Sequence, residues 1–230
     1  MKLKNKVALV TGGSEGLGFS IAKNLISKGV KVTICARTEK NLDIAKKKIN
    51  SDNLKTIKCD VANYEQVEKM FKQLGQVDIL INAAGVWFNG QLEEHSKEQI
   101  DLQIDINLKG TVYTCKQAVA LMKKENNGYI VNVSSTSGLK GQSNRCVYVA
   151  SKFGVRGLTD SLKIDLKDTN IKVVGFYPGG MNTNLFKHSK NKVDTSKLMD
   201  PNKVAEIVVF AIERDESMIM DHVVVNRRNK

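Results

Sequence analysis

The fold is decided close to the N-terminus, where the apolar run Val7-Ala-Leu-Val10 leads directly into Thr11-Gly-Gly-Ser-Glu-Gly-Leu-Gly18. Glycines at positions 12, 16 and 18 allow a tight turn and a close approach of a ligand to the backbone. The segment 16–27 then carries apolar residues at helical spacing. Because the first turn of a helix offers free N–H groups and the positive end of its dipole, this stretch predicts a phosphate-binding loop of the dinucleotide type.

Short runs rich in β-branched residues recur along the rest of the chain, and most of them are apolar on both faces. This pattern is typical of parallel strands buried between helices. Helical patterns lie between the runs, so the sequence predicts an α/β fold: a doubly wound Rossmann fold whose seven-stranded, mainly parallel sheet has helices on both faces. The expected strands are Val7–Val10, Lys31–Ala36, Leu54–Cys59, Val77–Ile81, Tyr129–Val133, Ile171–Phe176 and His222–Val225.

The expected helices have recognisable capping residues at their ends. One stretch, 182–198, has no periodic pattern and is polar and lysine-rich, so we interpret it as a lid over a substrate. No linker interrupts the alternation, which predicts one domain over residues 1–230. The expected helices are Gly16–Ser27, one opened by Thr38, one opened by Asn63, a long one from Ser96 towards Lys124, Val147–Lys167, and one opened by Asp200-Pro201.

The composition is that of a soluble globular protein: 230 residues, 41% hydrophobic and 26% charged, with 17 Gly and 2 Pro. It excludes collagen and low-complexity disorder. No apolar run approaches the roughly 20 residues of a membrane span, and Met1–Lys6 leads straight into a short strand, so we expect no signal peptide. The four cysteines and three histidines lack metal-ligand spacing. We therefore expect reduced thiols, a cytoplasmic location and no metal.

The chain is strongly basic, with a formal net charge of +12. That charge permits anionic partners such as nucleic acid, anionic lipid or a phosphorylated cofactor. The lysines are scattered, however, and their densest runs, 46–48 and 187–197, read as solvated faces. No nucleic-acid-binding motif is recognisable, so we expect neither a nucleic-acid nor a membrane partner.

A second motif, Tyr148-Val-Ala-Ser-Lys152, places a phenol and an amine on one face of an expected helix. A phenol with an ordinary pKa near 10 is a poor acid or base at neutral pH unless a cation stabilises the phenolate, which Lys152 is placed to do. Ser135 follows the fifth expected strand, at the edge where parallel strands end. Together the three side chains predict an acid–base site in the same crevice as the glycine-rich loop.

Further short motifs complete a set that covers essentially the whole chain. With them the sequence resembles the short-chain dehydrogenase/reductase family, in its NADP-preferring subgroup. The motifs are Thr11–Gly18, Asp60-Val61, Asn82-Ala83-Ala84-Gly85, Asn107, Ser135, Tyr148 with Lys152, and Pro178-Gly179 leading to Thr183.

The resemblance implies that Tyr148 is the general acid and base, that Ser135 orients the substrate oxygen, and that Lys152 lowers the pKa of Tyr148 and holds the nicotinamide ribose. Asn107 is implied to kink its helix, so that a backbone carbonyl holds a water of the proton relay. Asn82 has a structural alternative, because its side chain can bridge neighbouring strands. The implied catalytic residues are Asn107, Ser135, Tyr148 and Lys152. The implied cofactor-binding residues are Gly12, Ser14, Glu15, Gly16, Leu17, Gly18, Arg37, Thr38, Asp60, Val61, Asn82, Ala83, Ala84, Gly85, Tyr148, Lys152, Pro178, Gly179 and Thr183.

The residues after the second expected strand bear on cofactor choice. A carboxylate there would bind the adenosine ribose hydroxyls and repel a 2′-phosphate. Ala36 stands where NAD-preferring relatives often carry Asp, and Arg37 offers a guanidinium suited to phosphate. Glu15 departs from the basic residue that NADP-preferring relatives often carry. The sequence therefore predicts NADP(H) as the preferred cofactor, with NAD(H) possible.

The expected function is hydride transfer between a nicotinamide and a carbonyl or secondary alcohol of a small substrate, by a homodimer or homotetramer. One alternative is a 3-oxoacyl-[acyl-carrier-protein] reductase, and another is a non-catalytic nicotinamide-sensing or basic binding protein. The expected substrate crevice is bordered by 86–88, 138–146 and 182–192. Its apolar candidates are Trp87, Leu139 and Phe186, and its candidates for an anionic substrate are Lys140, Arg145 and Lys187.

Overall fold

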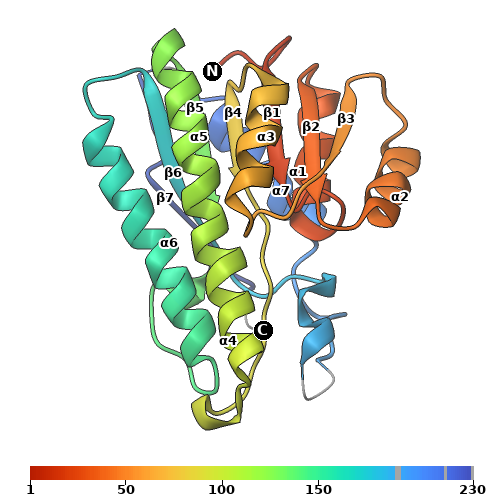
Figure 1. Ribbon diagram of the computed structural model, residues 1–230, viewed down its shortest axis with the longest axis vertical. Helices are drawn as coiled ribbons and strands as arrows, with labels where there is room; N and C mark the ends of the chain where they lie inside the picture. Colours follow the sequence, from red (N-terminus) through yellow and green to blue (C-terminus); the bar gives the residue numbers. More distant parts are fainter. Residues whose placement is uncertain (190–192, 215–216, 229–230) are drawn as a thin grey trace.

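The computed structural model describes residues 1–189, 193–214 and 217–228. Its centre is a seven-stranded sheet in the order β3-β2-β1-β4-β5-β6-β7 (Figure 1), and every paired strand runs parallel to its neighbour. The chain builds one half outward from β1 and the other outward from β4. The strands are β1 Val7–Thr11, β2 Lys31–Ala36, β3 Leu54–Lys58, β4 Ile79–Asn82, β5 Gly128–Val133, β6 Ile171–Pro178 and β7 His222–Val225.

Helices cover both faces of this sheet (Figure 1). One face is covered by α1 Gly16–Ser27, α2 Glu39–Ile49 and α7 Pro201–Ile212. The other is covered by α3 Tyr64–Leu74, α5 Gly110–Glu125 and α6 Cys146–Asp165. A further helix, α4 Lys97–Ile104, continues the line of α5 beyond the carboxyl edge of the sheet (Figure 1). The predicted doubly wound fold is confirmed.

Two apolar clusters, one on each face, hold these layers together. Successive residues of a strand alternate between them: Ile79 and Ile81 of β4 join the cluster under α1 and α7, whereas Leu80 joins the cluster under α3 and α5. Because both faces are buried, the strands carry the continuous apolar runs seen in the sequence. Strand and helix boundaries therefore lie within about two residues of the predicted ones, with one exception.

The exception is the long helix predicted from Ser96 towards Lys124, which is not one helix. A π-helical turn, Asp105–Lys109, separates α4 from α5. Within it the Asn107 side chain accepts a hydrogen bond from Val86 N at 2.8 Å and donates to Val86 O at 3.0 Å. These long-range bonds hold the extra residue in the turn, and single π-turns of this kind are frequent at functional sites. Apolar periodicity cannot reveal them.

The stretch predicted to be irregular, 182–198, is anchored at both ends and contains a short 3₁₀ helix, Asn184–His188. A bridge between Met181 and Met199 closes its base. Residues 190–192, at the end of the border predicted for the substrate crevice, lie outside the described residues. The first described part of this stretch, residues 182–189, forms the lid.

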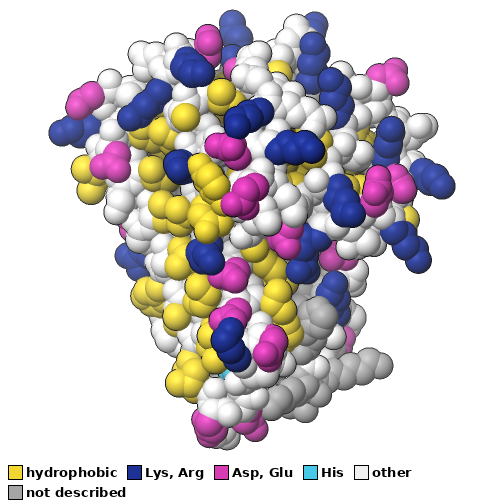
Figure 2. All heavy atoms as spheres, in the orientation of Figure 1, with side chains coloured by type: hydrophobic (Ala, Val, Ile, Leu, Met, Phe, Trp, Pro, Cys, Tyr) yellow, Lys and Arg dark blue, Asp and Glu magenta, His cyan; other side chains and the backbone are white. Residues whose placement is uncertain are grey.

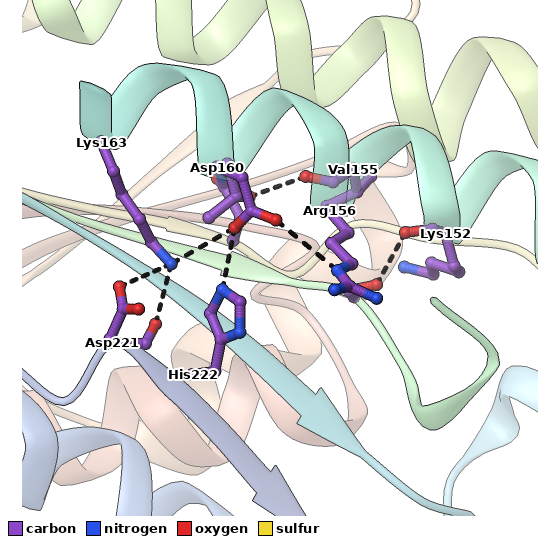
Figure 3. Close-up of polar contacts among 10 residues, drawn as sticks. Lys152, Val155, Arg156, Asp160, Lys163, Asp221 and His222 are labelled. Atoms are coloured by element: carbon purple, nitrogen blue, oxygen red, sulfur yellow. Dashed lines mark hydrogen bonds and ion pairs between the residues drawn. The ribbon is translucent and has the colours of Figure 1, made fainter. Parts of the chain in front are cut away.

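The edge strand β7 is tied to α6 by a cluster of charges (Figure 3). Asp160 accepts a hydrogen bond from His222 Nε2 at 2.8 Å, and Lys163 Nζ lies 2.7 Å from a carboxylate oxygen of Asp221. Partial burial alone would raise the pKa of Asp160, but the His222 hydrogen bond and the charge of Lys163 outweigh it and hold that pKa below its usual value. This cluster lies outside the cavity described below.

The described part of the chain contains neither a candidate membrane-spanning helix nor a candidate metal-binding cluster. Within it, no helix is both long and apolar enough to cross a bilayer. The same residues contain no group of three or more His, Cys, Asp or Glu side chains arranged to hold a metal ion.

Candidate active site

A cavity runs along the carboxyl edge of the sheet and crosses the point between β1 and β4 where the strand order reverses. Ligands of open α/β sheets bind at this position. Most of the predicted site residues line the cavity, and of the predicted set only Asn82 and Asn107 are not among its described lining residues. The predicted residues that line it are Gly12, Ser14, Glu15, Gly16, Leu17, Gly18, Arg37, Thr38, Asp60, Val61, Ala83, Ala84, Gly85, Ser135, Tyr148, Lys152, Pro178, Gly179 and Thr183.

The glycine-rich loop leaves the room that a pyrophosphate needs. Gly12 and Gly16 have positive φ angles of 63° and 58°, which favour glycine. A Cβ at Gly18 would lie 2.5 Å from the carbonyl oxygen of Gly12, and one at Gly16 would lie 3.3 Å from Thr183 Cγ2. Side chains at these positions would fill the cradle in front of the α1 N-terminus. The loop therefore fits a diphosphate bound through backbone N–H groups.

The adenosine end of the cavity is formed where β2 and β3 end. Arg37 is exposed, and no ion pair links it to any carboxylate of the described residues. Glu15 turns away from this end: its carboxylate accepts a hydrogen bond from Asn184 Nδ2 at 2.9 Å and lies 4.0 Å from Lys187 Nζ. Asp60 accepts a hydrogen bond from Ala62 N at 3.0 Å, which fixes its turn. Glu15 is thus neutralised by the lid, and Arg37 is left available to an anion.

Tyr148 and Ser135 meet at the other end of the cavity. Ser135 caps a 3₁₀ turn after β5, where its Oγ accepts from Ser137 N at 3.1 Å, and it also hydrogen-bonds the Tyr148 hydroxyl. Burial raises the pKa of Tyr148 to about 12, while the Ser135 hydrogen bond and the charge of Arg145 oppose that rise. The phenol is therefore protonated at neutral pH in the protein alone.

Lys152 lies one helical turn beyond the tyrosine and is 95% buried by the protein, with an exposed fraction of 5%. Its Nζ donates to Val133 O at 3.0 Å and lies 5.8 Å from the centre of the Tyr148 ring. Burial lowers the pKa of Lys152 to about 8. The amine faces the cavity beside Gly85, since a Cβ at that glycine would lie 3.9 Å from Nζ.

The two predicted asparagines that do not line the cavity are buried, and their side chains hold the segments that form its wall. Asn82 Nδ2 donates to Asn132 Oδ1 at 2.9 Å, and its Oδ1 accepts from Thr114 at 2.7 Å. The side-chain amide of Asn82 thus hydrogen-bonds to interior residues rather than to the cavity. This favours the structural interpretation over the predicted cofactor contact. Asn107 Nδ2 also donates to Ser151 Oγ at 3.1 Å, so the asparagine locks the loop after β4 against α6.

The positioning roles of three further residues were not predicted. Thr11 Oγ1 accepts from both Ala83 N and Ala84 N at 3.1 Å and so shapes the loop after β4. Ser134 Oγ donates to Lys152 O at 2.9 Å, which fixes α6 against the end of β5. Asn132 of β5 accepts a hydrogen bond from Asn82 of β4 and donates one to Thr159 of α6, so it links these two elements. Their signal in the sequence was a polar residue within or just after a strand that is otherwise apolar.

The substrate end is built from three loops. Trp87 packs edge-to-face on Phe186 of the lid, with ring centres 5.0 Å apart, and the Arg145 guanidinium lies 5.5 Å from the Trp87 ring centre. These three residues and Lys187 line the cavity, as predicted. Leu139 and Lys140 were predicted with them but are not among its described lining residues. Their segment turns outward after the 3₁₀ turn, and Lys140 is exposed.

The arrangement places a buried proton donor and an orienting hydroxyl at one end of a cavity whose other end fits a diphosphate and an anion near the ribose. Such a site can bind a dinucleotide and exchange a proton with an oxygen of a second ligand. No described residue of the cavity belongs to a metal-binding group.

Comparisons with known proteins agree with this geometry. A family model described as short chain dehydrogenase matches residues 6–194. An uncharacterized oxidoreductase of Staphylococcus saprophyticus is 33% identical over 98% of both chains, and one of Staphylococcus aureus strain USA300 is 31% identical over 97% of both.

Solved structures are similar as well. The closed form of a serine dehydrogenase complexed with NADP⁺ has a TM-score of 0.85 at 28% identity, covering 95% of this chain and 93% of that one. An actinorhodin polyketide ketoreductase variant with NADPH has a TM-score of 0.87 at 29% identity, covering 96% and 95%. On the family model and on these relatives, the chain belongs to the short-chain dehydrogenase family and is an oxidoreductase of that family.

Proposed function

We propose that the protein is an NADP(H)-dependent reductase that converts a carbonyl of a small substrate into a secondary alcohol, and that can run in reverse. The observation that carries the proposal is the hydrogen-bonded pair of Tyr148 and Ser135 in the cavity that also contains the glycine cradle. The NADP-complexed relatives support the choice of nicotinamide.

The residues of the cavity fit this cofactor. Gly12, Gly16 and Gly18 would receive its pyrophosphate at the α1 N-terminus, Arg37 its 2′-phosphate, and Lys152 its nicotinamide ribose. When bound, the cofactor supplies the hydride that is exchanged with the substrate carbon.

The protein's own residues supply position and proton. Ser135 orients the substrate oxygen, and Tyr148 gives its proton to that oxygen in the direction of reduction. A pKa of about 12 keeps Tyr148 protonated at neutral pH, which suits an acid. Asn107 acts behind them, because it holds the loop 86–90 and Ser151 in place. Its own carbonyl accepts from Thr111 Oγ1 at 2.8 Å, and in this proposal the same carbonyl holds a relay water.

A panel of ketones, aldehydes and oxo acids, assayed with NADPH and with NADH through the loss of reduced-nicotinamide absorbance, tests the function. We expect turnover with NADPH preferred by about tenfold or more, because one charge-assisted contact contributes about 1.5–3 kcal/mol. Arg37→Ala should erase this preference by weakening NADPH binding while leaving NADH nearly unchanged. Glu15→Gln is the matched control, since Glu15 faces the lid, and it should keep the preference.

Two results would contradict the proposal. Absence of turnover of every carbonyl class would remove the reductase function. Equal use of both cofactors, unaffected by Arg37→Ala, would make Arg37 a solvated surface residue and remove the 2′-phosphate contact.

We also propose that the protein is a homodimer or homotetramer. Apolar side chains gather over α4, α5 and α6 (Figure 2), where Leu102, Val112 and Phe153 are exposed. An exposed apolar patch of this kind supports burial against a second copy. Light scattering should give at least twice the chain mass of 25.5 kDa, and a monomer at micromolar concentration would contradict the proposal.

The four free thiols support a reducing, cytoplasmic compartment.

A further inference from the structure

The substrate end of the cavity holds a cation without an anionic partner. Arg145 stands just before α6 and is half-buried. Its guanidinium donates to the Gln142 side-chain oxygen and faces the Trp87 ring. No carboxylate of the described residues pairs with it. Because a partly desolvated charge is stabilised by an opposite charge, the site is complementary to an anion.

The other cations of the cavity are already engaged or lie elsewhere. Lys152 donates to Val133 O, and Lys187 is paired with Glu15. Arg37 belongs to the end of β2, at the adenosine side. Arg145 is therefore the cation available at the substrate end among the residues that the structure describes.

The loop that carries Arg145 is fixed in place. Asn144 has a left-handed backbone with φ of 59°, and its carbonyl accepts from Gly90 N at 3.0 Å. This bond ties the loop before α6 to the loop that carries Trp87. The lid is tied to the same loop, since Ser189 Oγ donates to Asn89 Oδ1 at 3.1 Å. The guanidinium is thus held over the pocket before any ligand arrives, which lowers the entropic cost of binding.

Arg145, Tyr148 and Ser135 line the same cavity. Arg145 is the N-cap residue of α6, three positions before Tyr148, and its charge acts on the Tyr148 hydroxyl. An anion on Arg145 and an oxygen on Tyr148 and Ser135 can therefore belong to one small substrate. A planar guanidinium suits the two oxygens of a carboxylate.

We propose that Arg145 binds the carboxylate of a short oxo acid, so that the substrates are 2-oxo or 3-oxo acids and their hydroxy acids. The proposal rests on the function proposed above. When bound, NADPH would supply the hydride to the oxo carbon; Tyr148 gives its proton to the oxygen and regains one from solvent, so that the products are the hydroxy acid and NADP⁺. The carboxylate itself takes no part in the chemistry, so Arg145 determines specificity.

Two matched substrate pairs test this proposal: 2-oxobutanoate and 3-oxobutanoate, each against its methyl ester. The members of a pair share the carbonyl and differ in charge. For each acid that the protein reduces, we expect kcat/KM to be about 10- to 100-fold higher than for its methyl ester. One charge-assisted hydrogen bond contributes a difference of this size. Arg145→Met should remove this advantage mainly through KM, so that the acid-to-ester ratio falls to near one.

Two further variants complete the series. Arg145→Lys keeps the charge but loses the planar fork, and should retain part of the acid advantage. Arg156→Met is the matched control: Arg156 lies on the same helix but pairs with Asp160 outside the cavity (Figure 3), so this variant should keep the full acid-to-ester ratio.

Binding gives a second readout that does not depend on turnover. Trp87 is the single tryptophan of the chain and lies under Arg145, so its fluorescence should respond to 2-oxobutanoate or 3-oxobutanoate in the wild type and not in Arg145→Met. An acid-to-ester ratio near one in the wild type overturns the proposal while the reductase function stands. A Trp87 response that needs Arg145, without reduction of acid or ester, supports the carboxylate site and removes the reductase function. No Trp87 response and no turnover overturns both.

Discussion

Replacing Tyr148 by Phe is expected to lower kcat for carbonyl reduction by about 10²- to 10⁴-fold, the usual contribution of a positioned general acid. The hydroxyl is the group that this substitution removes, while the buried ring keeps its packing. Loss of its hydrogen bond to Ser135 costs about 1 kcal/mol of stability at most. NADPH binding, measured by fluorescence titration, should therefore stay within about twofold of the wild type.

Tyr177→Phe is the matched control for that result. Tyr177 is also fully buried, in β6, and its hydroxyl has no hydrogen-bond partner among the described residues. Removing an unpartnered buried hydroxyl should leave activity unchanged and should not lower the free energy of unfolding. Full reductase activity of Tyr148→Phe would show that the proton comes from another group, and the mechanism proposed for this site would be wrong.

The second large effect concerns Lys152, whose burial opposes folding. Lowering its pKa from 10.5 to about 8 corresponds to about 3 kcal/mol of unfavourable free energy for the charged amine. Lys152→Met removes this charge, and the carbonyl of Val133 faces the cavity, where water can replace the lost hydrogen bond. We expect the variant to be about 1–3 kcal/mol more stable than the wild type at pH 7 and to lose activity by about 10²-fold or more.

The stability gained by Lys152→Met should depend on pH in a defined direction. Between pH 8 and 10.5 the unfolded chain keeps a proton on Lys152 that the folded protein has released, so the stability of the wild type rises with pH over this window relative to the variant. The gain from Lys152→Met should therefore be complete below pH 8 and vanish above about pH 10.5. Denaturant unfolding at several pH values measures it.

Lys163→Met is the control on the same helix. Lys163 pairs with Asp160 and Asp221, so its loss should slightly destabilise the protein and leave activity intact. A wild type and a Lys152→Met variant of equal stability at every pH would show that folding does not lower the pKa of Lys152.

The sequence determined the fold and the family because the features that encode them are local. Strands buried on both faces read as apolar runs, and the glycine spacing between 12 and 18 is imposed by backbone geometry within one turn. Tyr148 and Lys152 are adjacent on one helix, so their juxtaposition follows from helical spacing alone. The proximity of these two side chains was therefore predictable from the sequence.

The tertiary structure alone decided features that depend on contacts between distant segments. The helix break at Asn107 needs the backbone of Val86, and the amide of Asn82 is used by Asn132 and Thr114 rather than by the cavity. At the substrate end, three loops of similar composition were candidates, yet Arg145 faces Trp87 while Lys140 points to solvent. Local sequence cannot fix such choices, because each hydrogen bond or ring contact joins residues whose approach is set by the packing of the whole sheet.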